Sequence, residues 1–419
     1  MSFIYKHTCR LCNSSELDEV LCLCPTPLAN EFLSDPILSL NQDKYDLNLM
    51  MCKSCGHVQL SIVVSPDRLF RNYVYVSGTS PKFVKHFEDY AISLITDVNL
   101  EPNDLVVDIG SNDGTFLSFF KKEKMRTVGV DPAFDIADNA TRSGIKTIPD
   151  FFNEKVVNDI INEYGNASLV TANNVFAHAD DLTDIASNIH KLLSDDGVFV
   201  FEVQYFPRMC EDMLFDMIYH EHVSYHHVGP LINFFASIGM SLYDVKEVPT
   251  HGGSIRCFVD KGIRMVRPSV STLCGRELAL GLTVPGILNT KLDDPLKTMG
   301  DRLSSLKTKI KKRLDYYKDW DSDIAGFGAP AKATTLMHYF DIDNSYIKYV
   351  IDDNPLKQNL YIPGRGIPIV PFSHLGKNSP VCLFILAWNF SESIIDKCKD
   401  YRNSGGRFMV PLPNYLEIK

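Results

Sequence analysis

The sequence lacks long apolar runs, an excess of basic residues and an apolar leader. No segment approaches the ~18 consecutive apolar residues of a membrane-spanning helix, and Met1–His7 lacks the basic-then-apolar pattern of a signal peptide. The 419 residues include 42 basic and 52 acidic side chains, a net charge of −10, which argues against a nucleic-acid or membrane-surface binder. We therefore expect a cytoplasmic protein with no nucleic-acid and no membrane partner. A monomer is also expected, although the sequence leaves the oligomeric state open.

Cysteine is scarce after residue 56: six of the eleven cysteines lie before it and five are scattered beyond. In a reducing compartment this distribution indicates metal binding rather than a disulfide framework. Two C-x2-C pairs offer four thiolates, which suit a closed structural zinc site. A redox dithiol would need one pair at a helix N-terminus after a strand, and neither pair has that setting. We predict structural zinc held by Cys9, Cys12, Cys52 and Cys55, with His57 outside the ligand set.

The chain divides into three parts by composition and by the pattern of predicted strands and helices. Residues 1–75 are cysteine-rich, residues 76–262 alternate short apolar runs with helical stretches, and residues 263–419 contain a predicted long helix at 292–320 and a second alternating unit. Strands of the middle part are predicted at 105–109, 127–131, 168–171, 198–202, 241–248 and 254–260. Because strand–helix alternation indicates a parallel, doubly wound sheet, we predict an α/β protein with a small N-terminal domain (1–75) and two Rossmann-like domains (76–262 and 263–419).

A glycine turn follows the first predicted strand of the middle part. Its glycines let a ligand approach the backbone beside a helix N-terminus. A dinucleotide site would have G-x-G-x-x-G, whereas here a carboxylate, Asp113, lies inside the turn. It would repel a pyrophosphate and suit the ammonium group of S-adenosylmethionine. The turn therefore predicts a site for this cofactor that includes Asp108, Gly110, Asp113 and Gly114.

Further polar and aromatic residues follow the next predicted strands. Asp131 can accept both hydroxyls of a ribose, and Asp150 with the neighbouring phenylalanines offers an acceptor and an apolar wall for adenine. Asn173 ends the fourth strand, where the ligand crevice of an open sheet lies. A glycine turn of purely structural use would leave Asp113 and Asp131 to be explained separately. The other predicted cofactor residues are Asp131, Pro132, Asp150, Phe151, Phe152, Asn173 and Asn174.

Four of the twelve histidines lie within nine residues, Tyr219–His227. An H-x-H pair could bind metal, although the H-E-x-x-H zinc motif is absent. An imidazole could instead take a proton near neutral pH, oriented by the neighbouring Tyr and Glu. A polar helix end with solvated histidines is the third interpretation. Residue types alone leave these alternatives open.

Together these motifs resemble the three-domain sugar C-methyltransferases of branched deoxysugar pathways. The resemblance runs along essentially the whole chain, and the order and spacing of the motifs are specific to the family. It is carried by the two cysteine pairs, Pro27–Asn30, Cys55–Leu60, Tyr73–Ser80, the Asp108 turn, Tyr219–Tyr225, His251–Arg256 and Gly326–Lys332. The resemblance implies that the middle domain is a class I methyltransferase domain.

The resemblance also implies a reaction: methylation at C3 of a nucleotide-linked 4-keto-6-deoxy sugar by S-adenosylmethionine. Carried over by motif, His222 is the general base. Tyr73, His178, Tyr219 and Glu221 surround the sugar. A C–H beside a ketone can be removed by an imidazole if donors stabilise the enolate. The enolate carbon then attacks the methyl group in line. The sulfonium already activates that methyl group, so no metal is required and zinc is expected to be structural only.

The C-terminal unit opens with Gly326-x-Gly328 after a predicted strand. We expect a degenerate Rossmann-like module that helps to hold the substrate diphosphate, although a second cofactor and a solvent-facing Lys332 remain alternatives. The predicted substrate residues are Ser254, Arg256, Gly328 and Lys332, with Lys357 and Arg365 as further candidates. The alternative functions are a nicotinamide-dependent sugar oxidoreductase and a zinc-ribbon scaffold with an inactive methyltransferase fold. The nucleotide, thymidine or guanosine diphosphate, stays open.

Overall fold

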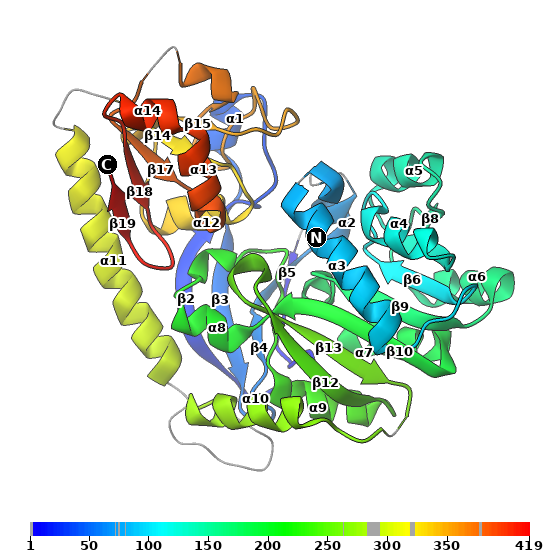
Figure 1. Ribbon diagram of the computed structural model, residues 1–419. Helices are drawn as coiled ribbons and strands as arrows, with labels where there is room; N and C mark the ends of the chain where they lie inside the picture. Colours follow the sequence, from blue (N-terminus) through cyan, green and yellow to red (C-terminus); the bar gives the residue numbers. More distant parts are fainter. Residues whose placement is uncertain are drawn as a thin grey trace.

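The structure is a computed structural model that describes residues 3–71, 73, 76–79, 81–262, 264–282, 294–318, 323–376 and 379–419. Figure 1 shows a middle unit on the right, a C-terminal unit at the upper left, and N-terminal strands between them. The predicted domain limits at residues 75 and 263, and the ends of the helix expected at 292–320, lie outside the described residues. Within the described residues, no helix combines the length and apolar character needed to cross a membrane.

The middle unit is built on a seven-stranded sheet of order β12-β13-β10-β9-β6-β7-β8. Strands β6 to β10 are parallel, while β13 pairs antiparallel with both β10 and β12. The strands are β6 (Leu105–Ile109), β7 (Arg126–Val130), β8 (Thr147–Ile148), β9 (Ala167–Asn173), β10 (Leu193–Gln204), β12 (Ser241–Val248) and β13 (Ser254–Asp260).

Helices cover both faces of this sheet because neighbouring residues of each strand point to opposite sides. Val106 packs with Tyr90 and Phe116 under α3 and α4, whereas Val107 packs with Val156 and Phe235 under α6 and α9. The helices are α3 (Pro81–Asp97), α4 (Thr115–Lys122), α5 (Phe134–Arg142), α6 (Glu154–Tyr164), α7 (Leu182–Leu192), α9 (Val228–Ser237) and α10 (Pro268–Ala279).

The N-terminal strands form a four-stranded sheet of order β11-β4-β3-β2. Its edge strand β11 (Ser224–Tyr225) comes from the histidine-rich segment and pairs antiparallel with β4. The N-terminal elements are β1 (Phe3–Tyr5), β2 (Leu17–Thr26), α1 (Pro36–Leu40), β3 (Tyr45–Cys52), β4 (Val58–Leu60), β5 (Ile62–Val64) and α2 (Pro66–Phe70). The sheet is thus completed by a distant part of the chain.

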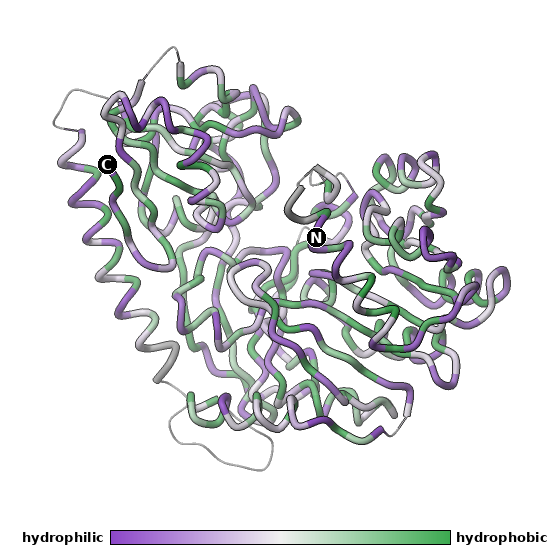
Figure 2. The backbone as a smooth tube through the Cα atoms, viewed as in Figure 1, coloured by the Kyte–Doolittle hydropathy of each residue, from purple (hydrophilic) through white to green (hydrophobic). Residues whose placement is uncertain are grey.

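The C-terminal unit has a six-stranded sheet of order β16-β15-β14-β17-β18-β19, parallel except for β19. Its strands are β14 (Ile324–Phe327), β15 (Ile347–Ile351), β16 (Ile369–Val370), β17 (Cys382–Ile385), β18 (Arg407–Val410) and β19 (Leu416–Ile418). Its helices are α11 (Asp294–Lys318), α12 (Lys332–Tyr339), α13 (Ser391–Lys397) and α14 (Lys399–Asn403). Figure 2 shows the sheet strands as mainly hydrophobic and the outer helix α11 as mainly hydrophilic.

One hydrophobic core joins the N-terminal sheet to the C-terminal unit. Leu47 and Leu49 of β3 belong to the same buried cluster as Leu336 of α12 and Phe384 of β17. Segment 206–218, with helix α8 (Phe206–Glu211), is also part of this cluster. The α/β fold with a second parallel sheet is confirmed. The predicted strands 241–248 and 254–260 match β12 and β13 to the residue.

Candidate active site

The four predicted zinc ligands come together. Cys9 and Cys12 lie in the turn after β1, Cys52 ends β3, and Cys55 lies in the turn before β4. Their sulfur atoms all lie within 4.8 Å of one another, with Sγ–Sγ distances of 3.5 Å for Cys9–Cys55 and Cys12–Cys52. Four thiolates at this spacing fit a tetrahedral ion with bonds of about 2.3 Å, a geometry that zinc favours. The donor set therefore fits structural zinc.

The glycine turn after β6 is closely packed. Gly110 has φ +70°, and a Cβ there would overlap Val175, so only glycine fits. Asp113 accepts the backbone N–H of Thr115 at 3.1 Å and that of Gly78 at 2.9 Å. Gly114 caps α4 with φ +75°. The turn thus leads directly into a helix N-terminus, as predicted, and Asp113 also anchors the segment that precedes α3.

Asp131 lies one residue beyond β7, which ends at Val130 rather than at the predicted residue 131. Its two carboxylate oxygens accept the backbone N–H groups of Asn112 and Ala133, both at 2.9 Å. Asp131 therefore stabilises the glycine turn itself. Asp108 lies deeper: it is buried, accepts the Thr171 hydroxyl at 2.6 Å, and burial raises its pKa to about 7.

The residues predicted to surround adenine contact Arg71, which the sequence reasoning missed. The Arg71 guanidinium lies 4.7 Å from the ring centre of Phe134 and 4.6 Å from that of Phe151. It also lies 3.6 Å from a carboxylate oxygen of Asp150 and donates to the Pro132 carbonyl at 3.4 Å. Phe152, in contrast, is buried in the core on the α6 side of the sheet.

Asn173 ends β9 with its side-chain amide buried: neither Oδ1 nor Nδ2 has a hydrogen-bond partner among the described residues. A buried amide without partners is costly, so this side chain fits a ligand with both donors and acceptors. The next residue, Asn174, has φ +57° and donates its N–H to the Glu202 carbonyl at 2.8 Å. Together with the glycine turn, Asn173 fits S-adenosylmethionine at the carboxyl edge of the sheet.

His222 lies in a stack of rings. Its ring centre is 4.1 Å from that of Tyr219 and 5.1 Å from that of His178, which in turn stacks on Phe70 at 5.4 Å. The His222 Nδ1 lies 2.8 Å from the Met217 carbonyl oxygen. A carbonyl only accepts, so Nδ1 carries the hydrogen and Nε2 is the unprotonated nitrogen. Burial lowers the pKa of His222 to about 4.

Glu221 faces a different set of partners. Its two carboxylate oxygens accept from Asn30 at 2.6 Å and from the Tyr73 hydroxyl at 3.0 Å. Burial raises the pKa of Glu221 to about 7, and the two hydrogen bonds and the charge of Lys357 oppose this rise. The predicted residues Tyr73 and Glu221 are therefore in direct contact, as are Tyr219, His178 and His222.

A buried ion pair lies at the end of β10. Antiparallel pairing of β10 and β13 sets Glu202 opposite Arg256, and Arg256 donates to Glu202 Oε1 from Nε at 2.9 Å and from Nη2 at 2.5 Å. The guanidinium also lies 3.3 Å from the ring centre of Tyr90. Arg256, predicted to contact substrate, is thus engaged within the protein. Ser254 likewise donates its hydroxyl to the Thr250 carbonyl at 3.0 Å.

Lys332 begins α12 and is buried against Trp388, with its Nζ 3.5 Å from the indole ring centre. Trp388 donates its Nε1–H to the buried Asp216 at 2.6 Å. Burial lowers the pKa of Lys332 to about 8, and the charge of Asp216 opposes this fall. Gly328, at φ +87°, packs against Ala387. Lys332 is therefore not a solvent-facing residue.

The two further phosphate candidates bind the protein backbone. Lys357 donates to the Ala329 carbonyl at 2.8 Å, and Arg365 donates to the Met337 carbonyl at 3.0 Å.

No sequence motif pointed to three residues near the site: Asp216, Trp388 and Arg71. Each of them contacts partners from distant segments of the chain. His251, in contrast, lay within a motif of the resemblance. It has φ +53°, and its pKa is lowered to about 4, chiefly by burial and then by Lys332.

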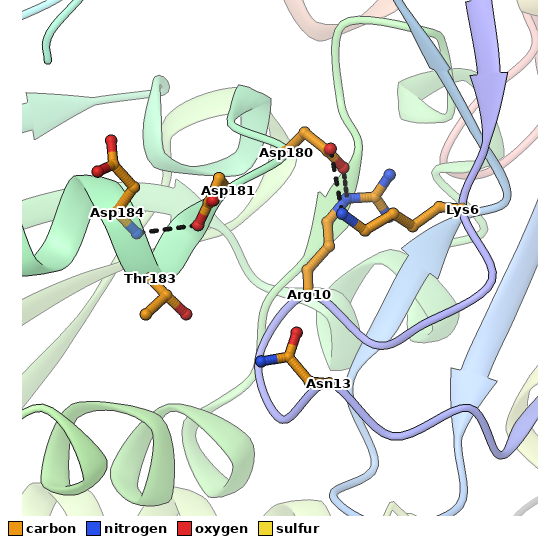
Figure 3. Close-up of a pocket in the computed structure, with 7 residues that line it drawn as sticks. All are labelled: Lys6, Arg10, Asn13, Asp180, Asp181, Thr183 and Asp184. Carbon is orange, nitrogen blue, oxygen red and sulfur yellow. Dashed lines mark hydrogen bonds and ion pairs between the residues drawn. The ribbon is translucent and has the colours of Figure 1, made fainter.

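Arg10, next to Cys9, links the cysteine-bearing turn to the segment that carries His178. Its Nε donates to Asp180 at 3.0 Å and its Nη1 to the Leu60 carbonyl at 2.9 Å. Figure 3 shows Lys6 and Arg10 converging on Asp180. Asp180 follows His178 by two residues, so the cysteine-bearing turn contacts the segment of one predicted catalytic residue.

Comparisons with known proteins agree with this arrangement. Three family models match, described as "Putative zinc binding domain" (residues 9–70), "Methyltransferase domain" (84–244) and "C-methyltransferase C-terminal domain" (249–413). The chain is 32% identical to the C-methyltransferase NovU of Streptomyces niveus over 407 residues, 97% of this chain and 95% of the relative.

Among the solved structures that resemble part of the chain are two methyltransferases. An S-adenosylmethionine-dependent methyltransferase from Clostridium acetobutylicum covers 43% of this chain and 92% of its own, with 15% identity and a TM-score of 0.35. Magnesium protoporphyrin IX methyltransferase from Synechocystis PCC 6803 covers 43% and 79%, with 13% identity and a TM-score of 0.32.

The match to NovU extends over nearly the full length of both chains. It favours neither a nicotinamide-dependent oxidoreductase nor an inactive scaffold, and the C-terminal unit with its Gly326 turn lies inside the matched C-methyltransferase region. The cysteine cluster and the strand-end residues fit zinc and S-adenosylmethionine respectively. The chain belongs to the NovU-type family of zinc-containing, S-adenosylmethionine-dependent C-methyltransferases.

Proposed function

We propose that this C-methyltransferase acts at C3 of a nucleotide-linked 4-keto-6-deoxy sugar. The observation that carries the proposal is the tautomer of His222. Its Nδ1–H is held by the Met217 carbonyl at 2.8 Å, which leaves Nε2 as an acceptor. Burial lowers the pKa of this imidazole to about 4, so it is unprotonated at neutral pH. A base so placed suits removal of the acidic hydrogen beside a ketone.

The rings around His222 would hold the ketone. His178 and Tyr219 lie on the His222 ring at 5.1 and 4.1 Å between ring centres, and Tyr73 reaches the adjacent Glu221. In this proposal, Tyr73 donates its one hydroxyl hydrogen to Glu221, whereas N–H or O–H donors from His178 and Tyr219 bind the C4 oxygen. They stabilise it as it becomes an enolate, an effect commonly worth several kcal/mol.

The strand-end residues would hold the cofactor. Asp113 and Asn173 would bind its methionine part, Asp131 its ribose, and Asp150 with Phe151 its adenine, while Asp108, Gly110, Gly114, Pro132, Phe152 and Asn174 shape the site. Bound S-adenosylmethionine supplies an electrophilic methyl group on a sulfonium. In this proposal the methyl group reaches C3 from the face of the sugar opposite His222.

The buried Lys332 is the best supported of the four predicted substrate residues. It is a cation at the N-terminus of α12, beside the Gly328 turn, where amide groups and a positive charge can meet a phosphate. Arg256 would act indirectly, by neutralising Glu202, and Ser254 by fixing the hairpin turn. We also propose three domains, residues 1–75, 76–262 and 263–419, with α10 at the start of the third packed on the middle unit.

A direct test is incubation with S-adenosylmethionine and a panel of thymidine- and guanosine-diphosphate 4-keto-6-deoxy sugars, followed by mass spectrometry for the gain of one methyl group. Sugars deuterated at C3 locate the reaction, because methylation there must remove the label. Methylation at another position with the C3 label retained, or failure with every sugar of the panel, would contradict the proposal. The two nucleotide arms identify the preferred carrier.

A further inference from the structure

Asn30 brings the N-terminal segment into contact with the histidine-rich segment. It follows β2, and its Nδ2 donates to Oε1 of Glu221 at 2.6 Å. The Tyr73 hydroxyl donates to Oε2 of the same carboxylate at 3.0 Å. Glu221 is 2% exposed, so these donors stand in place of water. Each carboxylate oxygen thus has a donor from a different part of the chain.

The segment that carries Asn30 is itself fixed. Leu28 and Ala29 are buried, and the Thr334 hydroxyl of α12 donates to the Ala29 carbonyl at 3.3 Å. The Glu31 N–H closes a turn on the Leu28 carbonyl at 3.3 Å. An amide on such a fixed segment cannot follow a rotation of Glu221. The hydrogen bond therefore selects one orientation of the carboxylate.

Three described groups act on the Glu221 carboxylate: Asn30, Tyr73 and the ammonium group of Lys357. Lys357 is itself buried and bonded to the Ala329 carbonyl, so its position is also set. Burial opposes the charge of Glu221, whereas all three groups favour it. The hydrogen bond from Asn30 is the shorter of the two that Glu221 accepts. Asn30 is also a neutral partner that can be changed without removing a predicted catalytic group.

We propose that Asn30 is a positioning residue, which favours the carboxylate form of Glu221 and turns it so that Oε2 receives the Tyr73 hydroxyl beside His222. The inference rests on the proposed function in one respect, that Glu221 and Tyr73 border the reacting sugar. Asn30 itself touches neither the cofactor nor the sugar in this scheme. Its effect passes through Glu221, so it has to be visible in the titration of that carboxylate.

Three variants separate this role from simple packing. Asn30→Leu removes the donor at similar volume, Asn30→Asp keeps the shape but puts an acceptor in its place, and Asn30→Gln keeps the amide. Without the donor the ionised form of Glu221 is less stable, so its pKa rises. The acidic limb of the pH profile of kcat/KM should move to higher pH by roughly one unit in Asn30→Leu. The acidic limb should move further to high pH in Asn30→Asp. In Asn30→Gln it should return part of the way to its wild-type position.

A second readout does not depend on turnover. In enzyme labelled with carboxyl-¹³C glutamate, the Glu221 signal is assigned by its loss in Glu221→Gln and followed through a pH titration. We expect a midpoint near 7 in the wild-type enzyme and a higher one in Asn30→Leu. In Asn30→Asp the two carboxyl groups titrate as a pair, and the upper step should exceed the wild-type midpoint, so this variant carries the test if Asn30→Leu does not fold.

The outcomes are distinguishable. A raised ¹³C midpoint in an enzyme that methylates no 4-keto sugar would retain the role of Asn30 and reject the proposed function. Identical midpoints and superimposable pH profiles in folded, zinc-containing variants would overturn the role of Asn30, whatever the substrate. A general loss of kcat with an unmoved acidic limb would also overturn it, because that result indicates packing alone.

Discussion

The backbone N–H of Val223 donates to the carbonyl of Ala177 at 3.0 Å. Each residue adjoins a histidine of the proposed site, His222 and His178. The two imidazoles, 5.1 Å apart between ring centres, are therefore held by a main-chain contact as well as by packing. Substitution of one imidazole should leave the other in place, which makes single-residue tests of their roles meaningful.

The first prediction concerns His222. If it removes the C3 proton, His222→Asn should bind both ligands almost normally and lose about 10²–10⁴-fold in turnover. Without a methyl donor, the wild-type enzyme in D2O should exchange the C3 hydrogen of the keto sugar, and the Asn variant should not. Proton NMR of the sugar measures this directly, with an enzyme-free sample to correct for spontaneous exchange. Exchange and methylation at wild-type rates in the variant would exclude His222 and direct attention to His178.

The second prediction concerns zinc. Freshly purified wild-type enzyme should contain roughly one zinc ion per chain, and serine at any of Cys9, Cys12, Cys52 or Cys55 should lower both metal content and melting temperature, because zinc binding is coupled to folding. Cys22→Ser is a matched control, since Cys22 lies in β2 outside the cluster. Metal analysis and thermal unfolding provide the measurements. Equal zinc content in the cluster variants and the Cys22 control would refute the assignment.

The third prediction concerns Asp131. Its carboxylate accepts the N–H groups of Asn112 and Ala133, so Asp131→Ala should loosen the glycine turn as well as remove a ribose acceptor. We expect S-adenosylmethionine affinity to fall by about ten- to a hundred-fold, the size of a lost hydrogen bond to a charged group. Asp131→Asn keeps one acceptor, so its S-adenosylmethionine affinity should lie between those of the wild type and Asp131→Ala. Isothermal titration calorimetry on folded variants measures this, and an unchanged affinity in Asp131→Ala would remove Asp131 from the site.

The fourth prediction concerns Lys332 and pH. Burial lowers the pKa of Lys332 to about 8, so the side chain is charged below that pH and becomes neutral above it. If it binds the diphosphate, the KM for the nucleotide sugar should rise as the pH passes about 8, with a smaller change in kcat. Lys332→Arg keeps its charge, so its KM should stay level over the same range. A wild-type KM that is also level would argue against a phosphate contact.

Much of the fold could be predicted because its signals are local. A short apolar run that enters a glycine turn marks β6 and β14, and the hairpin at 241–260 is bounded by its own turn residues. The cysteine pairs fall in tight turns whose spacing is set within a few residues. Asp113 and Asn173 followed from the general rule that ligands bind at the carboxyl edge of a parallel sheet.

The remaining features depend on contacts between distant segments. Arg256 looked like a free cation, yet the register of β10 against β13 sets it opposite Glu202, and no local pattern fixes that register. The Trp388–Asp216 hydrogen bond joins residues 172 positions apart. A two-residue strand such as β11 is too short to show a period of its own. These pairings became visible only when the segments were placed in space.

The edge strand β11 has a consequence for the order in which the chain folds. Synthesis runs from the N-terminus, so β2, β3 and β4 leave the ribosome long before Ser224 and Tyr225. Until those two residues emerge, β4 keeps an open edge with unpaired backbone groups, the kind of edge that invites association with other chains. The segment that is made first is thus among the last to be completed, and a nascent chain stalled before residue 225 should expose it.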